Sequence, residues 1–352
     1  MLSFLSNIYG RIVDSRNRRF DEGDTAVVDI GVRTISVGNI TTGGTGKTPV
    51  TIRLAELLAG RGKRVGILTR GYGRRSERQR VVVSDGRKIL ADAATGGDEP
   101  VMMAARLIGK AVVIADADRA SAGEWAAKEF GVNAFVLDDG FQHRRVRRDL
   151  DIVCIDALDP FGDEKLLPKG RLREPLEGLA RASFLIVNRA ETAARICGKT
   201  RAEILAEISL RLAEYAPGIP VIGTTTRFAR MTPLDRYLEG LGVDASGGRD
   251  IGSMANKKGF AFCGLGRPEA FFEKLRADNF ELAGERAFAD HHQYSRREIA
   301  GLVREAQAAD ADYLLTTAKD AVKLASVQPD MACFVVEVDL VIDDERGFAT
   351  MI

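Results

Sequence analysis

The sequence of 352 residues is poor in the residues that build disulfide frameworks and metal centres. It contains four cysteines and three histidines. The cysteines are widely spaced and form no C-x-x-C pair, so we expect reduced, mainly buried thiols in a cytosolic protein; they are Cys154, Cys197, Cys263 and Cys333. His291 and His292 are adjacent, but no third ligand stands at a metal-binding spacing, which argues against a zinc site.

Long apolar runs and an excess of one charge sign are also missing. No apolar stretch approaches the roughly 18–20 residues that span a bilayer, and the first residues lack the pattern of a signal peptide. The net charge of +1 gives no general attraction for nucleic acid, so we expect no nucleic-acid partner. The remaining composition, 45% hydrophobic and 29% charged, is that of a globular chain with a substantial core.

The first 20 residues carry an amphipathic helical pattern. Apolar side chains recur at i, i+3, i+4 and i+7, namely Met1, Leu2, Phe4, Leu5, Ile8, Tyr9, Ile12 and Val13. Four arginines lie among or after them: Arg11, Arg16, Arg18 and Arg19. Such a helix is typical of a segment lying on an anionic membrane surface, and it is equally typical of a helix packed on its own domain. The pattern alone leaves both alternatives open.

Strand-like and helix-like segments alternate along the chain, which predicts an α/β fold with a mostly parallel sheet and helices on both faces. We expect strands at 34–37, 64–69, 112–115, 134–138, 151–155 and 184–188, and helices at 49–60, 99–108, 119–130 and 201–215. This predicts a core domain over 21–226. A segment rich in Gly, Asp, Ser and Asn indicates a linker over 227–258, and a smaller C-terminal α/β domain is expected over 259–352.

The most informative segment joins a β-branched run to an amphipathic helix through a glycine-rich turn. It contains Thr41, Thr42, Gly43, Gly44, Thr45, Gly46, Lys47 and Thr48. Backbone N–H groups of such a turn and the following helix N-terminus surround a phosphate, as in the P-loop NTPases. Lys47 can reach the β- and γ-phosphates of a nucleotide, and the Thr48 hydroxyl can bind Mg²⁺. Thr41 occupies the position of the first glycine in the usual pattern.

Pairs of carboxylates lie at the ends of two other predicted elements. Asp138 and Asp139 end an apolar strand, where phosphate-loop enzymes place a carboxylate that holds Mg²⁺. Asp98 and Glu99 open a predicted helix. The helix dipole alone can explain them, but Asp98 could also serve as a base toward an acceptor hydroxyl, with Glu99 near the metal. The sequence does not separate these two interpretations.

Basic residues follow two predicted strands. The segment after Asp139 contains Arg144, Arg145, Arg147 and Arg148, and Arg70 opens a second basic loop. Such runs are usually solvated faces. At the carboxyl ends of parallel strands they can also form a rim for a phosphorylated or membrane-bound substrate.

Together these segments resemble the tetraacyldisaccharide 4'-kinase (lipid A 4'-kinase) family over nearly the whole chain. The segments that carry the resemblance are 36–49, 69–73, 97–100, 117–119, 138–143, 170–175, 288–292 and 316–320. The resemblance implies ATP-dependent, Mg²⁺-dependent phosphorylation of the 4'-hydroxyl of tetraacyldisaccharide 1-phosphate to give lipid IVA, by a peripheral enzyme at the cytoplasmic face of the bacterial inner membrane. It implies no obligate protein partner.

The resemblance also implies roles for individual residues. Asp98 would be the catalytic base, supported by His291, and Lys47 would stabilise charge on the phosphates. Thr48, Asp138 and Asp139 would hold Mg²⁺. The residues expected to shape the site for sugar and phosphate are Arg70, Arg119, Gln142, His143, Arg173 and Glu174.

Two rival functions use the same phosphate loop. A GTPase or metallochaperone-type ATPase would read its base with an Asn-Lys-x-Asp motif, and the segments 188–191 and 317–320 match it imperfectly. A membrane-partition ATPase would use the loop and the first helix but would not need Asp98, His291 or the basic rim.

Overall fold

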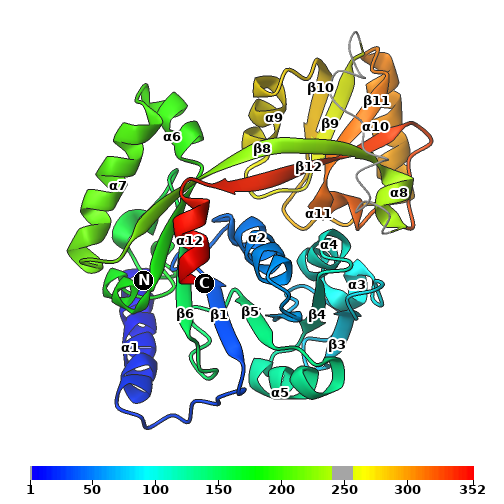
Figure 1. Ribbon diagram of the computed structural model, residues 1–352. Helices are drawn as coiled ribbons and strands as arrows, with labels where there is room; N and C mark the ends of the chain where they lie inside the picture. Colours follow the sequence, from blue (N-terminus) through cyan, green and yellow to red (C-terminus); the bar gives the residue numbers. More distant parts are fainter. Residues whose placement is uncertain (1, 240–256) are drawn as a thin grey trace. The chain divides into compact units, whose positions relative to one another are not determined.

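The computed structural model describes residues 2–239 and 257–352 (Figure 1). The greater part of the predicted linker, residues 240–256, therefore lies outside the described residues. The chain divides into two compact units. Unit 1 consists of residues 1–70, 116–226 and 340–352, and unit 2 of residues 71–115 and 227–339.

Unit 1 is built on a parallel sheet. Its strands are β1 (Arg33–Gly38), β2 (Val65–Thr69), β5 (Ala134–Asp138), β6 (Leu150–Asp156), β7 (Phe184–Asn188) and the first part of β8 (Val221–Pro233). Their order is β8-β7-β6-β1-β5-β2, and every neighbouring pair is parallel. The strands are short apolar runs that are buried almost throughout, as expected for a parallel sheet covered on both sides.

Helices and short turns complete unit 1. They are α1 (Leu2–Asp21), α2 (Lys47–Gly60), α5 (Arg119–Phe130), α6 (Ala190–Cys197), α7 (Arg201–Tyr215) and α12 (Glu345–Met351), with 3₁₀ turns η1 (Gly162–Glu164) and η2 (Leu176–Arg181). Helix α2 packs on β1, β2 and β5, and α7 packs on α6 and η2. Local signals define several boundaries: Asp118 caps the start of α5, and Thr200 forms a capping box with Glu203 at the start of α7.

Unit 2 also contains four parallel strands. Its strands β9 (Gly259–Cys263), β10 (Leu282–Ala287), β11 (Tyr313–Thr317) and β12 (Cys333–Ile342) have the order β10-β9-β11-β12. An antiparallel pair, β3 (Val81–Ser84) and β4 (Ala111–Ala115), belongs to the same unit. Its helices are α3 (Ala93–Gly96), α4 (Asp98–Arg106), α8 (Leu234–Leu238), α9 (Pro268–Ala277), α10 (Arg296–Ala308) and α11 (Ala318–Ala321). Helix α4 packs against α11, which brings two widely separated segments of sequence together.

The structure divides the chain differently from the predicted domains. Residues 71–115 leave the predicted core and join unit 2, and residues 340–352 return to unit 1. The return is held by contacts within unit 1: Arg53 pairs with Glu345, and the rings of Phe184 and Phe348 meet edge to face at 6.1 Å. The start of the predicted linker is also ordered, since residues 227–233 continue β8 and α8 follows. Long-range packing, which the local pattern does not record, decides these assignments.

Helix α1 presents two different faces. Ser6, Gly10 and Val13 are buried against unit 1. Another stripe stays exposed and apolar; its members are Leu2, Phe4, Leu5, Ile8 and Ile12, with exposed fractions from 41% to 68%. One face therefore docks on the domain, and the membrane-surface alternative for the other, exposed face stays a prediction. None of the helices in the described ranges is long and apolar enough to cross a bilayer.

Candidate active site

The glycine-rich turn forms a phosphate loop at the carboxyl end of β1. Gly43 has φ +103° and Gly46 has φ +81°, and both values lie in the region that only glycine adopts without strain. Helix α2 begins at Lys47, directly after Gly46, so the free N–H groups of its first turn face the loop. Thr41, in the place of the usual first glycine, is buried, and its backbone pairs with Leu172. Glycines with positive φ directly before a helix N-terminus are features that this loop shares with anion-binding loops.

Two asparagines donate hydrogen bonds to this loop. Asn39 Nδ2 donates to the Thr41 carbonyl at 2.7 Å and to Thr45 Oγ1 at 2.9 Å. Asn188, at the end of β7, donates to the Thr45 carbonyl at 2.7 Å. Neither asparagine was predicted to support the loop. Both lie at the carboxyl end of a strand, Asn39 directly after β1 and Asn188 as the last residue of β7, and ligands of α/β sheets bind at such ends.

The two aspartates at the end of β5 have different environments. Asp138 is buried and accepts hydrogen bonds from Thr51 Oγ1 at 3.2 Å and Thr69 Oγ1 at 3.0 Å. Asp139 has 37% of its side chain exposed and lies 3.4 Å from Lys47 Nζ. Lys47 and the end of β5 therefore lie side by side. Burial alone would raise the pKa of Asp139, but Lys47 and Arg173 lower it to about 2, so the carboxylate is ionised.

Arg119, at the start of α5, and His143 supply polar groups that still lack protein partners. Arg119 is 5% exposed, and its charge interacts with those of Asp138 and Asp139. Within the described ranges, Arg119 Nε and His143 Nε2 are buried without a hydrogen-bond partner. Burial and the neighbouring Arg119 and Arg148 lower the pKa of His143 to about 4, so this imidazole is neutral at pH 7. Unpaired buried donors and acceptors are unfavourable unless a ligand or water satisfies them, and Arg70 adds positive charge close to Arg119.

Three of the predicted substrate-binding residues have protein partners. Arg173 Nη1 donates to both carboxylate oxygens of Asp139 at 2.9 Å. Gln142 Nε2 donates to the Asn39 carbonyl and to Glu174 Oε1, both at 2.8 Å. Glu174 is fully buried. From that position it cannot contact a sugar directly, and the structure instead makes it a support for its neighbours.

The predicted base and its histidine meet in unit 2. Asp98, the first residue of α4, is buried, and its Oδ2 lies 2.8 Å from His291 Nδ1. Burial would raise the pKa of Asp98, but the hydrogen bond from His291 and the charge of Lys319 hold it below its usual value. The same hydrogen bond raises the pKa of His291. His291 has φ +59°, an unusual conformation for a non-glycine residue that often marks a functional position.

Lys319 of α11 completes this group and was not predicted. Its Nζ lies 3.2 Å from His291 Nε2 and 3.0 Å from Asp290 Oδ1. It also pairs with Glu99 at 3.5 Å. Because an ammonium can only donate, His291 Nε2 accepts from it, and Nδ1 carries the proton toward Asp98. The structure shows Glu99 paired with Lys319, and its role as a metal ligand stays a prediction.

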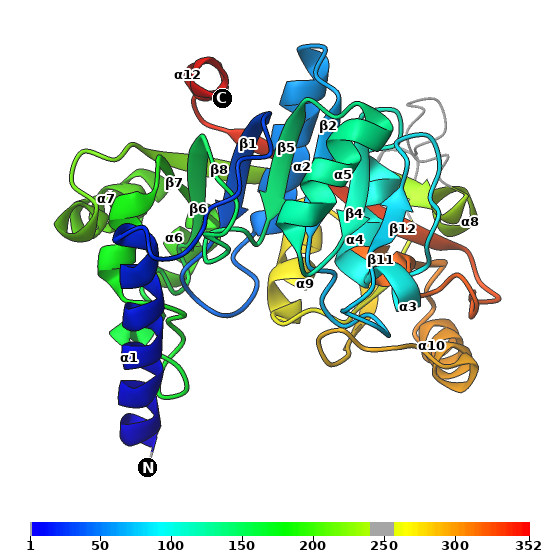
Figure 2. The same cartoon turned by 90° about the horizontal axis from the view of Figure 1, so that it is seen from below.

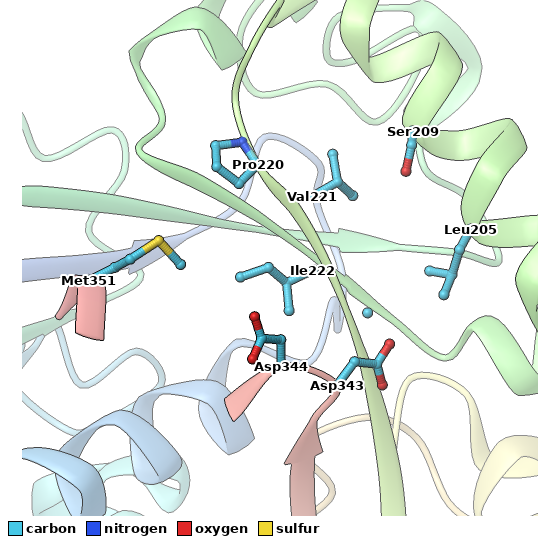
Figure 3. A pocket seen from close by; sticks show the side chains of 9 residues that line it. Leu205, Ser209, Pro220, Val221, Ile222, Asp343, Asp344 and Met351 are labelled. Atoms are coloured by element: carbon cyan, nitrogen blue, oxygen red, sulfur yellow. The ribbon is translucent and has the colours of Figure 1, made fainter. Parts of the chain in front are cut away.

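A pocket of about 360 Å³ lies elsewhere in unit 1. Figure 3 shows Asp343 and Asp344 at its edge, opposite Leu205 and Ser209 of α7. Its lining contains no lysine or arginine. Asp343 already pairs with Arg201 at 2.7 Å, and Asp344 caps α12. This pocket is unsuited to a nucleotide.

Comparison with known proteins identifies the family of the chain. The family model described as Tetraacyldisaccharide-1-P 4'-kinase matches residues 1–352. The chain belongs to this family. Tetraacyldisaccharide 4'-kinase of Halothermothrix orenii is 38% identical over 326 residues, covering 92% of this chain and 83% of that protein. The enzyme of the same name from Anaeromyxobacter sp. strain Fw109-5 is 39% identical over 332 residues, covering 93% and 84%.

A solved structure of the family is also similar in fold. The crystal structure of LpxK from Aquifex aeolicus, described as its "apo" form in complex with ATP, is similar with a TM-score of 0.77 at 29% identity. The match covers 99% of this chain and 96% of that one. The predicted P-loop type of α/β fold is confirmed.

The imperfect GTPase motifs have other roles in this member of the family. Asn188 braces the phosphate loop, as described above. Glu191, in the place of the base-reading aspartate, accepts from Thr225 Oγ1 at 2.5 Å and pairs with Arg201 at 3.0 Å. A carboxylate with two protein partners is a poor reader of guanine. The GTPase alternative is not favoured.

Proposed function

We propose that this chain carries out the reaction of its family: ATP-dependent transfer of the γ-phosphate to the 4'-hydroxyl of tetraacyldisaccharide 1-phosphate, giving lipid IVA. The family match over the whole chain supports the kinase activity and the place in lipid A biosynthesis. The phosphate loop supports the use of ATP, as does the relative described in complex with ATP.

In the proposed mechanism, Asp98 accepts the proton of the 4'-hydroxyl. The hydroxyl oxygen forms a bond to the γ-phosphorus, the bond from this phosphorus to the β–γ bridging oxygen breaks, and ADP leaves. Asp98 is ionised at neutral pH and oriented by His291 at 2.8 Å. Lys47 balances the charge that develops on the phosphates, and catalysis depends mainly on such positioning and electrostatics.

The residues at the loop fit a magnesium ion. Thr48 follows Lys47 in the first turn of α2, and the ionised Asp139 lies 3.4 Å from Lys47. Both offer hard oxygen ligands, and Mg²⁺ in kinases commonly uses one or two such groups together with nucleotide phosphates. Bound there, the ion would neutralise phosphate charge. Within the described ranges no cluster of three or more His, Cys, Asp or Glu could hold a metal, which agrees with a site completed by the nucleotide.

The exposed stripe of α1 supports peripheral binding to an anionic membrane, which we propose to be the cytoplasmic face of the bacterial inner membrane from the family resemblance alone. Phe4 is 68% exposed and Ile12 63%. Arg11, Arg18 and Arg19 are exposed on the same helix, where they can meet lipid phosphates. The acceptor is a lipid, so a helix in the interface would bring the site to its substrate.

The Asp98–His291 pair carries the proposal, because a nucleotide-gated switch or partition ATPase needs no base facing an acceptor. The test is to incubate the full chain with radiolabelled ATP and tetraacyldisaccharide 1-phosphate in detergent micelles. Glycerol and a protein serve as control acceptors, and GTP as the control donor. We expect label in the lipid only, with ATP preferred. ATP hydrolysis without lipid labelling, or a preference for GTP, would contradict the kinase assignment.

Membrane binding is tested separately by sedimentation with anionic vesicles. Phe4→Ser should reduce the bound fraction several-fold, since burying a large apolar side chain contributes about 1.5–3 kcal/mol. Leu210→Ser is the matched control, because Leu210 is a 74% exposed leucine on α7. Equal vesicle binding by the two variants would remove α1 from the membrane contact.

A further inference from the structure

The docking face of α1 contacts one segment of unit 1, residues 165–174. Ser6 Oγ donates to the Leu166 carbonyl at 2.8 Å, and Tyr9 OH donates to the Arg173 carbonyl at 2.8 Å. At Gly10, an added Cβ would lie 2.9 Å from Leu166 Cδ1. Figure 2 shows α1 running alongside this part of unit 1. These contacts include polar groups at defined positions, and membrane anchoring by the opposite stripe does not require them.

The contacted segment is joined to the phosphate loop by its backbone. Thr42 N–H donates to the Arg171 carbonyl at 2.8 Å, and Arg173 N–H donates to the Ile40 carbonyl at 2.7 Å. The Arg171 side chain adds a bond from Nη2 to the Thr42 carbonyl at 2.7 Å. Movement of this segment therefore changes the geometry of the loop itself.

Two side-chain relays extend from α1 into the site. In the first, Tyr9 holds the backbone of Arg173, whose guanidinium binds Asp139 beside Lys47. In the second, Asn17 Nδ2 donates to the buried Glu174 at 3.2 Å. Glu174 in turn accepts from Gln142, and Gln142 also donates to the carbonyl of Asn39, which braces the loop.

We propose that Tyr9 and Asn17 are positioning residues for the phosphate loop: α1 preorganises the nucleotide site through Arg173 and Glu174, independently of its membrane face. This rests on the proposed function, because it assigns the phosphate loop and Asp139 to nucleotide binding. Preorganised sites bind more tightly because less ordering remains to be done on binding. Loss of either relay at α1 therefore weakens nucleotide binding.

The test measures the dissociation constant of the full chain for Mg²⁺ with a non-hydrolysable ATP analogue, in detergent without vesicles. Tyr9→Phe removes one hydroxyl and keeps the ring. We expect it to weaken binding about three- to tenfold, as for loss of one hydrogen bond of ordinary strength. Asn17→Ala should act in the same direction through the second relay. Tyr215→Phe, the same change at the end of α7, is the matched control and should bind as the parent chain does.

A double-mutant cycle separates positioning from general stability. In the Arg173→Ala background, Tyr9→Phe should weaken nucleotide binding by a smaller factor than in the parent chain, because the guanidinium is gone, although the backbone bond from Arg173 N–H to the Ile40 carbonyl still joins this segment to the loop. Vesicle sedimentation of Tyr9→Phe should equal that of the parent chain. The inference is overturned if Tyr9→Phe leaves nucleotide affinity unchanged, or if its effect multiplies fully with that of Arg173→Ala. The readout does not use the lipid acceptor, so failure of lipid phosphorylation would be recognised separately.

Discussion

Replacing His291 by alanine tests the proposed base most directly. The change removes the 2.8 Å hydrogen bond between Nδ1 and Asp98 Oδ2. A hydrogen bond to a charged group contributes about 1.5–3 kcal/mol. The His291 side chain is 39% exposed, and solvent screening places the value at the lower end of this range. About 1.5 kcal/mol corresponds to a roughly tenfold loss of kcat/KM. Asp98→Asn, which removes the base itself, should cost about 10²–10⁴-fold.

The pH profile gives the second signature of this pair. His291 holds the pKa of Asp98 below its usual value, so the base stays ionised as the pH falls. Without His291 the pKa of Asp98 rises, and the acid limb of the kcat profile moves to higher pH. The control is His292→Ala, because His292 pairs with Glu298 at 3.1 Å and stacks on Phe288. If His292→Ala and His291→Ala lower lipid phosphorylation equally, with the same acid limb, His291 does not orient the base.

Three further changes test other parts of the structure. Lys47→Ala should lower turnover by at least about 10³-fold in the radiolabel assay, because phosphate charge is left uncompensated; normal turnover would contradict the loop assignment. Asp320→Asn should destabilise unit 2 by about 3–5 kcal/mol in urea unfolding, since it leaves the buried Lys323 ammonium without its counter-ion at 2.8 Å. Thr51→Val should weaken Mg²⁺-dependent nucleotide binding a few-fold by removing the 3.2 Å hydrogen bond to Asp138, and titration with the ATP analogue measures it.

The sequence predicted those parts of the fold that short-range signals define. Strands Ala134–Asp138 and Phe184–Asn188 and helices Arg119–Phe130 and Arg201–Tyr215 have their predicted boundaries. The strands are apolar runs that end in polar residues, and the helices begin after capping side chains. Strand β10 (Leu282–Ala287) was not predicted, because it contains the charged pair Glu285 and Arg286 and lies at the edge of its sheet, where burial is incomplete.

The glycine-rich loop and the proposed base were chosen from residue types and order, whereas the side chains around them could not be found in this way. A buried carboxylate such as Glu174 is unexpected, because charged residues are usually exposed unless they are paired. Its partners come from three separate segments: Asn17, Gln142 and Arg181. Lys319 likewise reaches Glu99 because α11 packs on α4. Such groupings depend on tertiary packing and leave no local pattern.

The two faces of α1 follow from the same helical periodicity that made its role ambiguous. Phe4, Leu5, Ile8 and Ile12 form one stripe at i, i+1, i+4 and i+8, and they remain exposed. The residues that dock form another stripe, Ser6, Tyr9, Gly10, Val13 and Asn17. A helix that served only as a membrane anchor would need the exposed apolar stripe alone. A helix that served only to support the domain would not leave that stripe in water. Because both stripes are present on one helix, mutation can test the proposed anchoring at the lipid surface separately from the proposed support of the nucleotide site.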